Sequence, residues 1–389
     1  MVVAGEASAD RYAARVVEVL RSRCPDVEAF GIGGPALERA GLECRADFRV
    51  LEIIGFSAVV ARLPRLLRLY RQLSRWLRER RPHVLLCVDL PDFNARLARR
   101  ARRLGIPVLF YVAPQVWAWR SGRAKRWRDL PSRLVVTLPF ELPLWQRNGL
   151  RVAYHGHPLL EELPARIPER RAAYTELGLN PERRTLVLAP GSRASEWKHH
   201  ADPLFGAAAR VLVEHPDLQL AVPLAPGIDA DLANDAAERA GIEVICTRAP
   251  HHALLSHADL GLICSGTLTL EAALAGLPML VFYRTGWANA LIARLLLETD
   301  RIALPNLLLG GPTPVFPELL QQAASADGLA AETLRLLADD AARAQLREAT
   351  AQVRARLSPG RPSLAVAETI LALASEVPAR DGPAKHAAR

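Results

Sequence analysis

Short apolar runs alternate with longer amphipathic segments along most of the 389-residue chain. The apolar runs are rich in Val, Leu and Ile and nearly continuous, which is typical of strands buried on both faces of a parallel sheet. The expected strands are Val84–Val88, Val108–Val112, Leu134–Thr137, Thr185–Ala189, Leu218–Val222, Glu243–Cys246, Leu260–Cys264 and Met279–Phe282. The expected helices include Phe93–Leu104, Asp202–Glu214, Asp229–Ala240 and Thr267–Ala275. Such alternation predicts a doubly wound α/β fold.

The alternation is interrupted at residues 155–182 by His155–Pro158, a charged segment and Asn180-Pro181, and it restarts at Thr185. This pattern predicts two Rossmann-like domains, residues 1–160 and 161–345. We expect them to face a central cleft, since α/β proteins bind ligands at the carboxyl ends of their strands. Residues 346–378 are expected to be C-terminal helices that pack back on the N-terminal domain, and residues 379–389 to be a disordered tail.

Cysteine usage and hydropathy restrict the class of protein. The five cysteines are scattered and lack CxxC spacing, which argues against a disulfide framework or zinc site and for a reducing compartment. No apolar run reaches the roughly 18 residues of a membrane span. Met1–Gly5 is too short for the apolar region of a signal peptide, and we interpret it as the last part of a first strand that has lost residues before it.

The formal net charge is +9, and the positive excess lies mainly in the first half of the chain. Residues 62–81 carry eight arginines interleaved with leucines and a tryptophan. Such a segment attracts anionic lipid, acidic glycolipid or nucleic acid. A solvated arginine-rich face is an equally good interpretation.

Two strand ends in the second half are suited to bind a diphosphate. In the first, Gly191 and Ser192 offer loop amides at the start of a helix, and Arg193 adds a guanidinium. Each feature alone is also found in ordinary turns.

The second strand end consists of Ser265, Gly266 and Thr267, and Glu271 follows one helical turn later. Small residues permit close approach of the backbone, and the carboxylate of Glu271 could accept hydrogen bonds from sugar hydroxyls. The two loops together predict a nucleotide-sugar site.

Two carboxylates, Asp89 and Asp92, follow a strand in the first half. We interpret Asp92 as the N-cap of the helix that begins near Phe93. Asp89 has no such role, so it is the candidate general base toward an acceptor hydroxyl.

Two further loops of the first half are candidates for the acceptor side. One is the N-terminal strand–loop–helix junction with Glu6 and Ser8, and the other is the aromatic-rich loop Ala113–Trp119 with Gln115. The tryptophans of the second loop either stack on a sugar or pack between domains, and the sequence leaves both open.

Several other patterns carry little weight. Asp229-Ala230-Asp231 matches a metal-binding DxD motif, but helix N-capping explains it better. The pairs His199-His200 and His251-His252 lack metal-ligand spacing, and we predict no metal site. The chain has no Walker or GxGxxG loop, which disfavours ATP and NAD chemistry.

Taken in order, these segments resemble the lipid-A-disaccharide synthase family over about residues 1–322. The matching motifs are Ala4-Gly5-Glu6-Ala7-Ser8, Gly31-Ile32-Gly33-Gly34-Pro35, Asp89-x-Pro91-Asp92-Phe93-Asn94, Pro114-Gln115-Val116-Trp117-Ala118-Trp119-Arg120, Leu138-Pro139-Phe140-Glu141, Gly156-His157-Pro158-Leu159, Pro190-Gly191-Ser192-Arg193-x-x-Glu196, Ser265-Gly266-Thr267-x-Thr269-Leu270-Glu271, Tyr283-Arg284 and Leu304-Pro305-Asn306-Leu307-Leu308.

The resemblance implies a GT-B-type fold and an inverting hexosyltransferase of lipid A biosynthesis. The enzyme would move 2,3-diacylglucosamine from UDP to 2,3-diacylglucosamine 1-phosphate, giving the disaccharide 1-phosphate and UDP, without a metal or other cofactor. It also implies a cytoplasmic protein of Gram-negative bacteria, peripheral at the inner face of the inner membrane. Residues 62–81 would then meet the membrane surface. Nucleic acid is not an expected partner, and a homodimer is one possible assembly.

The resemblance also implies roles for single residues. Asp89 would be the base, and Arg193 would stabilise the leaving UDP. The UDP-sugar would be bound by Gly191, Ser192, Glu196, Ser265, Gly266, Thr267, Glu271 and Asn306. The acceptor side would include Glu6, Ser8 and Gln115.

The chain departs from the family pattern in three places. Ala9 replaces a glycine, Ala58-Val59-Val60 replaces Glu-Val-Leu, and Phe316-Pro317-Glu318 replaces Val-Pro-Glu. Because Ala58 removes a carboxylate, acceptor recognition stays open. Two alternatives therefore remain: a GT-B enzyme for another UDP-sugar or glycolipid, and a non-catalytic membrane-binding paralogue.

Overall fold

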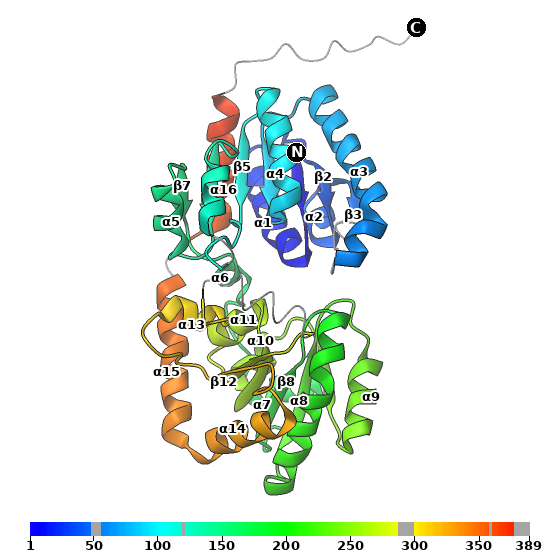
Figure 1. The fold of residues 1–389 in the computed structure, drawn as a ribbon, viewed down its shortest axis with the longest axis vertical. Helices are drawn as coiled ribbons and strands as arrows, with labels where there is room; N and C mark the ends of the chain where they lie inside the picture. Colours follow the sequence, from blue (N-terminus) through cyan, green and yellow to red (C-terminus); the bar gives the residue numbers. More distant parts are fainter. Residues whose placement is uncertain (48–55, 119–120, 287–298, 358–359, 377–389) are drawn as a thin grey trace. The chain divides into compact units, whose positions relative to one another are not determined.

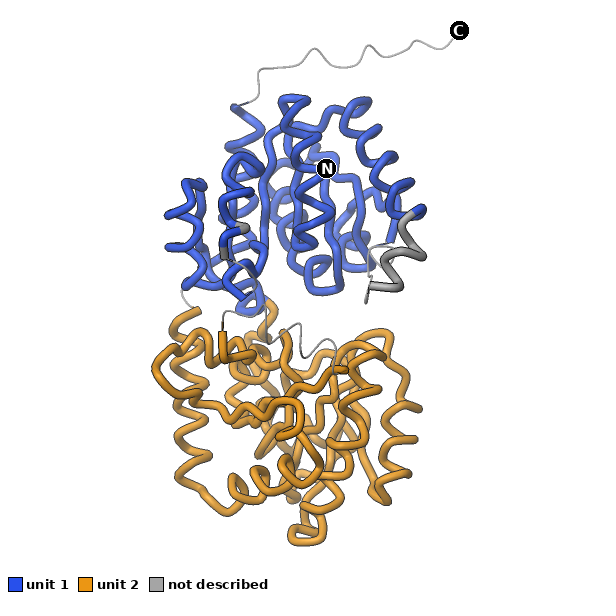
Figure 2. The backbone as a smooth tube through the Cα atoms, in the orientation of Figure 1, with its two compact units in different colours: residues 1–161, 359–389 blue, residues 162–358 orange. Residues whose placement is uncertain are grey.

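The computed structural model describes residues 1–47, 56–118, 121–286, 299–357 and 360–376 (Figure 1). The chain divides into two compact units (Figure 2). Unit 1 consists of Met1–Glu161 together with Pro359–Arg389, and unit 2 consists of Glu162–Ser358.

Unit 1 contains a seven-stranded sheet in its described part, with strand order β3-β2-β1-β4-β5-β6-β7 and parallel pairing throughout. The strands are β1 (Val2–Ala4), β2 (Phe30–Gly33), β3 (Glu43–Asp47), β4 (Leu85–Val88), β5 (Val108–Tyr111), β6 (Arg133–Val136) and β7 (Val152–Tyr154). The helices are α1 (Ala7–Arg23), α2 (Pro35–Arg39), α3 (Phe56–Glu79), α4 (Pro91–Arg103), α5 (Glu141–Arg147), α6 (Leu159–Glu162) and α16 (Pro362–Ser375), and Ser121–Trp127 forms a 3₁₀ helix.

The central strands of unit 1 are buried along their whole length, as parallel strands covered on both faces should be. Every residue of β4 and β5 is buried. Leu97, Ala98 and Ala101 of α4 belong to the same hydrophobic core, and the arginines at 96, 99 and 103 on that helix are exposed. One side of α4 is thus apolar and packs in the core, and the opposite side of the helix is basic.

Unit 2 contains a six-stranded parallel sheet, again in its described part, with strand order β10-β9-β8-β11-β12-β13. The strands are β8 (Thr185–Ala189), β9 (Gln219–Leu224), β10 (Ile245–Arg248), β11 (Leu260–Cys264), β12 (Met279–Tyr283) and β13 (Glu318–Leu320). The helices are α7 (Arg170–Leu177), α8 (Ala194–Glu214), α9 (Ala230–Ala240), α10 (His252–His257), α11 (Thr267–Ala275), α13 (Leu304–Leu309), α14 (Ala326–Ala338) and α15 (Asp340–Leu357).

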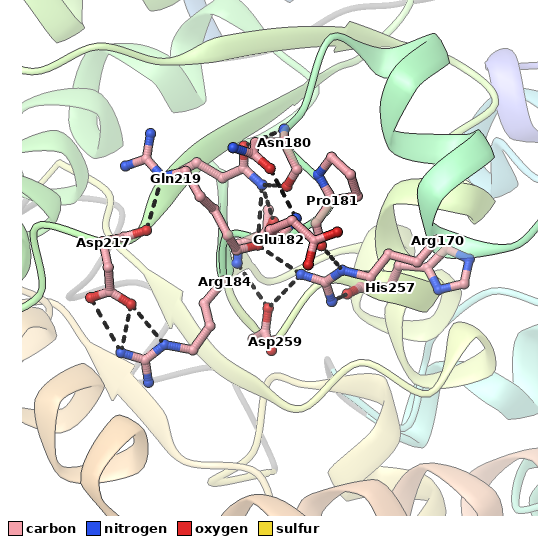
Figure 3. A network of polar contacts seen from close by, with 11 residues as sticks. Arg170, Asn180, Pro181, Glu182, Arg184, Asp217, Gln219, His257 and Asp259 are labelled. Atoms are coloured by element: carbon pink, nitrogen blue, oxygen red, sulfur yellow. Dashed lines mark hydrogen bonds and ion pairs between the residues drawn. The ribbon is translucent and has the colours of Figure 1, made fainter.

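A polar network fixes the amino ends of β8, β9 and β11 (Figure 3). The guanidinium of Arg170 donates to the carbonyl oxygens of Pro181 (3.0 Å) and His257 (2.7 Å). Its Nη2 lies 3.5 Å from Asp259, which accepts a hydrogen bond from the Thr185 amide at 2.8 Å. The network lies at the amino ends of these strands, whereas the predicted site follows the carboxyl ends of β8 and β11. It therefore supports the fold and not the chemistry.

The C-terminal helices divide between the units differently from the expected boundary at residue 346. That residue lies inside α15, which packs on α11 and α13 of unit 2. α16 packs on α1 of unit 1, where Glu161 accepts a hydrogen bond from the Ser363 amide at 3.2 Å. The chain therefore returns to unit 1 at Pro359. The expected tail, 379–389, lies outside the described residues.

The doubly wound α/β prediction is confirmed, and β8, β11 and α11 have the predicted bounds. The main difference is α8, which begins at Ala194 instead of Asp202. Pro203 lies inside this helix and does not start it. Among the helices that the structure describes, none combines the length and apolar character needed to cross a bilayer.

Candidate functional site

Both sheets have a topological switch point, where the strand order reverses direction. In unit 2 it lies between β8 and β11, and in unit 1 between β1 and β4. Ligands of open α/β sheets bind beside the carboxyl ends of strands at such points. The Gly191–Arg193 and Ser265–Thr267 loops follow β8 and β11, and Glu6 and Asp89 follow β1 and β4. The sequence-predicted candidates therefore lie at the switch points of their own sheets.

The loop after β8 requires glycine at its first bend. Gly191 has φ +132°, and a Cβ added to it would lie 2.4 Å from Oε2 of Glu196 and 2.7 Å from its Cβ. No side chain fits at that distance, so Gly191 lets the loop close against α8. The absence of a side chain at Gly191 leaves the space that the Glu196 carboxylate occupies.

Glu196 occupies the two loop amides that were expected to bind a diphosphate. Its Oε2 accepts hydrogen bonds from the amides of Ser192 (2.9 Å) and Arg193 (3.2 Å). Its Oε1 accepts one from Nη1 of Arg193 at 3.1 Å. Glu196 is buried, whereas half of the Arg193 side chain is exposed. Glu196 and the Ser192 amide thus hold the loop, and Arg193 remains accessible; direct binding of the donor by Ser192 and Glu196 stays a prediction.

The ends of β8, β11 and β12 share one electrostatic environment. Burial raises the pKa of the Cys264 thiol, the Glu196 carboxylate raises it further, and Arg193 lowers it. The pKa of Tyr283 is raised by burial and by the carboxylate of Glu196, and Arg193 again opposes the change. Arg193 is thus within electrostatic reach of the ends of all three strands.

The amino end of α11 is open to solvent. Gly266 is its N-cap, no side chain caps the helix, and a Cβ on Gly266 would meet nothing within 4 Å. Gly266 and Thr267 are exposed, and Glu271 is half-buried one turn into the helix. An uncapped helix end with room beside it suits an anionic group. This part of the predicted donor site is compatible with the structure.

The Ser265 hydroxyl has a structural partner. It donates to the carbonyl oxygen of Ile302 at 2.8 Å, which uses its single donor. Binding of the donor by Ser265 stays a prediction, and in this structure its hydroxyl proton is directed at a main-chain carbonyl. Ser265 thus ties the end of β11 to the segment before α13.

Asn306 is fully buried and its amide is saturated. Its Oδ1 accepts from the amides of Val315 (3.0 Å) and Phe316 (2.9 Å). Its Nδ2 donates to the Phe316 carbonyl (2.8 Å) and to Glu318 (2.7 Å). All four of its hydrogen-bonding positions are used, so direct contact with the donor, which we expected, does not fit. Glu318 also accepts from the Ile302 amide at 2.8 Å, so this acid ties Asn306 to the segment before α13.

Backbone strain is concentrated around Asp89 in unit 1. Asp89 has φ +54°, Leu90 has φ +49°, and Val112 after the neighbouring strand has φ +65°. Left-handed backbone is costly for such residues, above all for β-branched valine, and it tends to occur at functional sites. Gly5 makes room for the bend, because a Cβ there would lie 2.5 Å from Cβ of Leu90.

The main chain of Asp89 is held on both sides. Its amide donates to the Tyr111 carbonyl at 3.1 Å, and its carbonyl accepts from Nδ2 of the buried Asn94 at 2.7 Å. Its side chain is half-buried. Asp92 is exposed in the first turn of α4, whose N-cap is Leu90, so the interpretation of Asp92 as the N-cap is wrong. Asp89 thus follows the carboxyl end of β4 directly, whereas Asp92 lies on α4.

The acceptor-side candidates have mixed surroundings. The Ser8 hydroxyl donates to the Glu6 carboxylate, and both side chains are half-buried at the start of α1. Asp10, which the sequence reading did not single out, is buried and accepts hydrogen bonds from the amides of Gly34 (2.6 Å), Ala36 (3.0 Å) and Leu37 (3.2 Å). Asp10 thus explains the Gly-Gly-Pro motif: it caps α2 from α1. Ala9, a family glycine, is buried in α1.

The aromatic-rich loop is tied to the next loop of unit 1. Gln115 is exposed. The Trp117 indole donates to Glu141 at 3.0 Å, and its ring packs edge-to-face on Phe140 with centroids 5.1 Å apart. These contacts favour a structural role for Trp117, and Trp119 lies outside the described residues. Burial raises the pKa of Glu141 to about 7, against the hydrogen bonds from Trp117 and the Leu138 and Thr137 amides.

The DxD match is an N-cap, as predicted: the Asp229 carboxylate accepts a hydrogen bond from the Asp231 amide at 3.3 Å. Within the described ranges, no three His, Cys, Asp or Glu side chains gather closely enough to hold a metal ion. The side chain of Ala58 lies outside what the structure describes.

Residues 62–81, the arginine-rich segment of the first half, form one wall of a groove on unit 1. Its volume is about 440 Å³, and it lies between α3 and α4. The apolar side chains Leu66, Leu67, Tyr70 and Phe93 and the arginines at 96, 99, 100 and 103 line it. None of these lining residues is acidic, and Leu67 is 44% exposed. This surface combines exposed apolar area with four arginines.

Solved structures share the architecture at low sequence identity. UDP-GlcNAc 2-epimerase from Neisseria meningitidis, bound to UDP-GlcNAc, matches with a TM-score of 0.64 and 12% identity, covering 95% of this chain and 99% of that chain. The calicheamicin glycosyltransferase CalG4 matches with a TM-score of 0.59 and 16% identity, covering 97% and 98%. These matches confirm the two-domain α/β fold of the GT-B type.

Curated relatives are much closer in sequence. Lipid-A-disaccharide synthase of Anaeromyxobacter dehalogenans (strain 2CP-C) is 43% identical over 373 residues, covering 95% of this chain and 96% of the relative. The enzyme of the same name from Nitrosococcus oceani is 38% identical over 361 residues, covering 92% of each. The sequence model described as Lipid-A-disaccharide synthetase matches residues 1–366. With its candidate residues at both switch points, this chain belongs to the lipid-A-disaccharide synthase family.

Proposed function

We propose that this hexosyltransferase moves 2,3-diacylglucosamine from UDP to 2,3-diacylglucosamine 1-phosphate, giving lipid A disaccharide 1-phosphate and UDP. The observation that carries the proposal is the family match over nearly the whole chain, at identities up to 44%. The motif residues at the switch points of both sheets add support, because a transferase needs a base for one substrate and positive charge for the other.

On the donor side, Arg193 would stabilise the charge that develops on the leaving UDP. Its guanidinium and amide are already held by Glu196, so little reorganisation is needed as the bond breaks. The open helix end at Gly266 and Thr267 would receive the diphosphate, and Glu271 would accept hydrogen bonds from ribose hydroxyls. Gly191, Ser192 and Glu196 then act by shaping the loop.

On the acceptor side, Asp89 would take the proton of the attacking hydroxyl. The hydroxyl oxygen forms a bond to the anomeric carbon while the bond from that carbon to the UDP oxygen breaks, which inverts the anomeric centre. The strained backbone at Asp89 and Leu90, with both main-chain hydrogen bonds of Asp89 satisfied, supports a fixed position for this carboxylate. Glu6, Ser8 and Gln115 would contact the acceptor.

The proposal includes no metal, because Arg193 and the amino end of α11 would supply the positive charge that a diphosphate needs. It places the enzyme at the cytoplasmic face of the inner membrane, where both acylated substrates would be found. The groove between α3 and α4, with Leu67 exposed among arginines, supports contact with an anionic bilayer.

The test is product analysis with purified protein, UDP-2,3-diacylglucosamine and 2,3-diacylglucosamine 1-phosphate. We expect UDP release matched by a disaccharide 1-phosphate of the summed mass. Comparable turnover of unacylated UDP-N-acetylglucosamine, or of another glycolipid, would favour the alternative enzyme. An absence of turnover with every donor and acceptor would favour the non-catalytic paralogue.

A further inference from the structure

Three side chains from the first two turns of α8 bind the loop that precedes the helix. Glu196 accepts from the Ser192 and Arg193 amides. The Trp197 indole donates to the Gly191 carbonyl at 3.0 Å. Nδ1 of His200 lies 2.6 Å from the Pro190 carbonyl oxygen. Each of the four loop residues from 190 to 193 is thus held by a side chain of the helix that it begins.

His200 differs from the other two because it also binds a second strand end. The ring is fully buried and packs edge-on against Phe282 and Tyr283, with centroids 5.2 Å away in both cases. Its Nε2 lies 3.0 Å from the amide nitrogen of Arg284, directly after β12. In the sheet, β11 lies between β8 and β12. The imidazole therefore connects two loops that are not neighbours in the sheet, on either side of the strand that leads into Ser265.

The partners of the two ring nitrogens favour the His200 tautomer that is protonated at Nδ1. A carbonyl oxygen can only accept, so Nδ1 carries the proton that bonds to Pro190. Burial lowers the pKa of His200, and the lowered pKa favours the neutral ring. The carbonyls of Pro190 and Arg284 and the Glu196 carboxylate partly oppose this change. In the neutral ring Nε2 has a lone pair and accepts from the Arg284 amide; the Arg284 carbonyl also lies 2.9 Å away.

We propose that His200 is a positioning residue for the donor side of the reaction: by bridging Pro190 and Arg284 it sets the loop that presents Arg193. The proposal rests on the function proposed above for Arg193, but it concerns UDP binding, which can be measured without turnover. A ring that only filled space would need neither nitrogen, whereas both ring nitrogens of His200 have main-chain partners, one in the loop that leads to Arg193 and one directly after β12.

Three substitutions separate the two bonds from the packing. In His200→Asn the side-chain amide reaches the position of Nδ1, so the bond to Pro190 is kept and the bond to Arg284 is lost. In His200→Gln the amide reaches the position of Nε2, so the reverse holds. His200→Phe keeps a ring and loses both bonds. His199→Phe, at the half-buried neighbouring position, is the matched control.

The measurements are the Kd of UDP by calorimetry, the KM values of donor and acceptor, kcat, and the melting temperature. We expect His200→Phe to weaken UDP binding and raise the donor KM by about tenfold to about a hundredfold, since it loses two hydrogen bonds and each is worth up to about a factor of ten. Its acceptor KM should stay within about twofold of wild type. His200→Asn should recover most of the UDP affinity, because it keeps the loop bond, and His199→Phe should match wild type.

A lower melting temperature of His200→Phe with an unchanged UDP Kd and donor KM would overturn the proposal, because His200 would then only pack. If His200→Phe does not fold, His200→Asn and His200→Gln carry the test, and wild-type UDP affinity in both would equally overturn it. If the wild type binds UDP in a His200-dependent manner but turns over no acylated donor, the proposed function fails and the positioning role stands.

Discussion

The Glu196 carboxylate binds Arg193 at both ends of the residue, accepting from its amide at 3.2 Å and from its guanidinium at 3.1 Å. One buried acid therefore fixes where the arginine leaves the backbone and where its side chain points. A long flexible side chain normally loses rotamer freedom when it binds an anion. Here part of that loss has already occurred before a donor arrives, which is the condition under which a cation stabilises developing charge best.

Gly191→Ala should disrupt this arrangement. The added methyl would lie 2.4 Å from Oε2 of Glu196 and would require a left-handed backbone, so the carboxylate must move away from the loop. We expect loss of most activity and a destabilisation of about 2 kcal/mol or more, read from turnover and thermal melting. Gly227→Ala is the control: it has φ +87° but an open neighbourhood, so only the backbone cost should be seen, with activity retained. Equal effects of both substitutions would argue against the Glu196 clash.

Asp89→Asn should strongly slow catalysis while leaving UDP binding intact. The amide cannot accept the proton of the acceptor hydroxyl, so we expect kcat to fall by about 10²–10⁴. Steady-state kinetics and UDP calorimetry on one protein preparation measure both quantities. Asp92→Asn, at the exposed carboxylate in the first turn of α4, should stay within about threefold of wild type. The reverse order of effects would transfer the role of base to Asp92.

Asn306→Ala should act through stability. The substitution leaves the Val315 and Phe316 amides and Glu318 without their buried partner, so we expect a loss of about 3 kcal/mol in the free energy of unfolding. Denaturant unfolding followed by tryptophan fluorescence measures it. Asn234→Ala, at an exposed position on α9, should change stability by no more than about 0.5 kcal/mol. A direct donor ligand would show the opposite pattern, with normal stability and a raised donor KM.

Glu141 should make unit 1 less stable as the pH rises toward neutrality. Its pKa in the folded protein is about 7, above the ordinary value of 4.5, so the folded state resists ionisation. The stability is fully present below pH 4.5 and is lost as the pH rises to about 7, where the loss reaches about 3 kcal/mol. Thermal melting between pH 4.5 and 8 should therefore show a flatter pH dependence for Glu141→Gln than for wild type. The exposed Glu214→Gln on α8 should keep the wild-type dependence, and a wild-type slope in Glu141→Gln would contradict the prediction.

Leu67→Asp should weaken binding to vesicles that contain phosphatidylglycerol. Leu67 is 44% exposed beside the arginines of the α3–α4 groove, and replacing apolar area with a negative charge removes both attractions. We expect about tenfold weaker partitioning in a flotation assay, and weaker wild-type binding at high salt. Val213→Asp is the control, since Val213 is 83% exposed on α8. Equal losses for both variants would mean that the groove has no special part in membrane contact.

The sequence predicted best where an apolar run ends abruptly. β8 stops before Pro190, and β11 stops at Cys264 before Ser265-Gly266, so both strands and α11 were predicted with their observed bounds. β3 was missed because Glu43–Asp47 is a polar edge strand, with no residue fully buried. Its pairing with β2 depends on tertiary structure and leaves no apolar period in the sequence.

The sequence analysis did not predict that side chains of α8 bind the Pro190–Arg193 loop. The expected helix range began at Asp202, before Pro203, although a helix was also expected to start directly after the Gly191–Ser192 loop. The helix instead begins at Ala194 and continues through Pro203. The two turns that were lost contain Glu196, Trp197 and His200, the side chains that bind the loop.

Other features depend on contacts that the sequence pattern does not show. The left-handed backbone of Asp89 is held by Tyr111 and Asn94, and although the Asp89–Asn94 motif includes two of these residues, it does not reveal the backbone conformation. The saturation of Asn306 depends on Phe316 and Glu318. The motif identified Asn306 correctly as a special residue, but only the three-dimensional neighbours show that its amide serves the fold.

The discontinuity of unit 1 has a consequence for how the protein is made. Residues 1–161 leave the ribosome first, yet α16, whose Val366, Ala367 and Leu373 are buried in unit 1, is synthesised nearly last. Unit 2 is one continuous stretch of chain, so it can fold before α16 has been synthesised and before unit 1 is complete. A premature stop before residue 359 would thus spare the half that carries Arg193 and leave the half that carries Asp89 permanently unfinished.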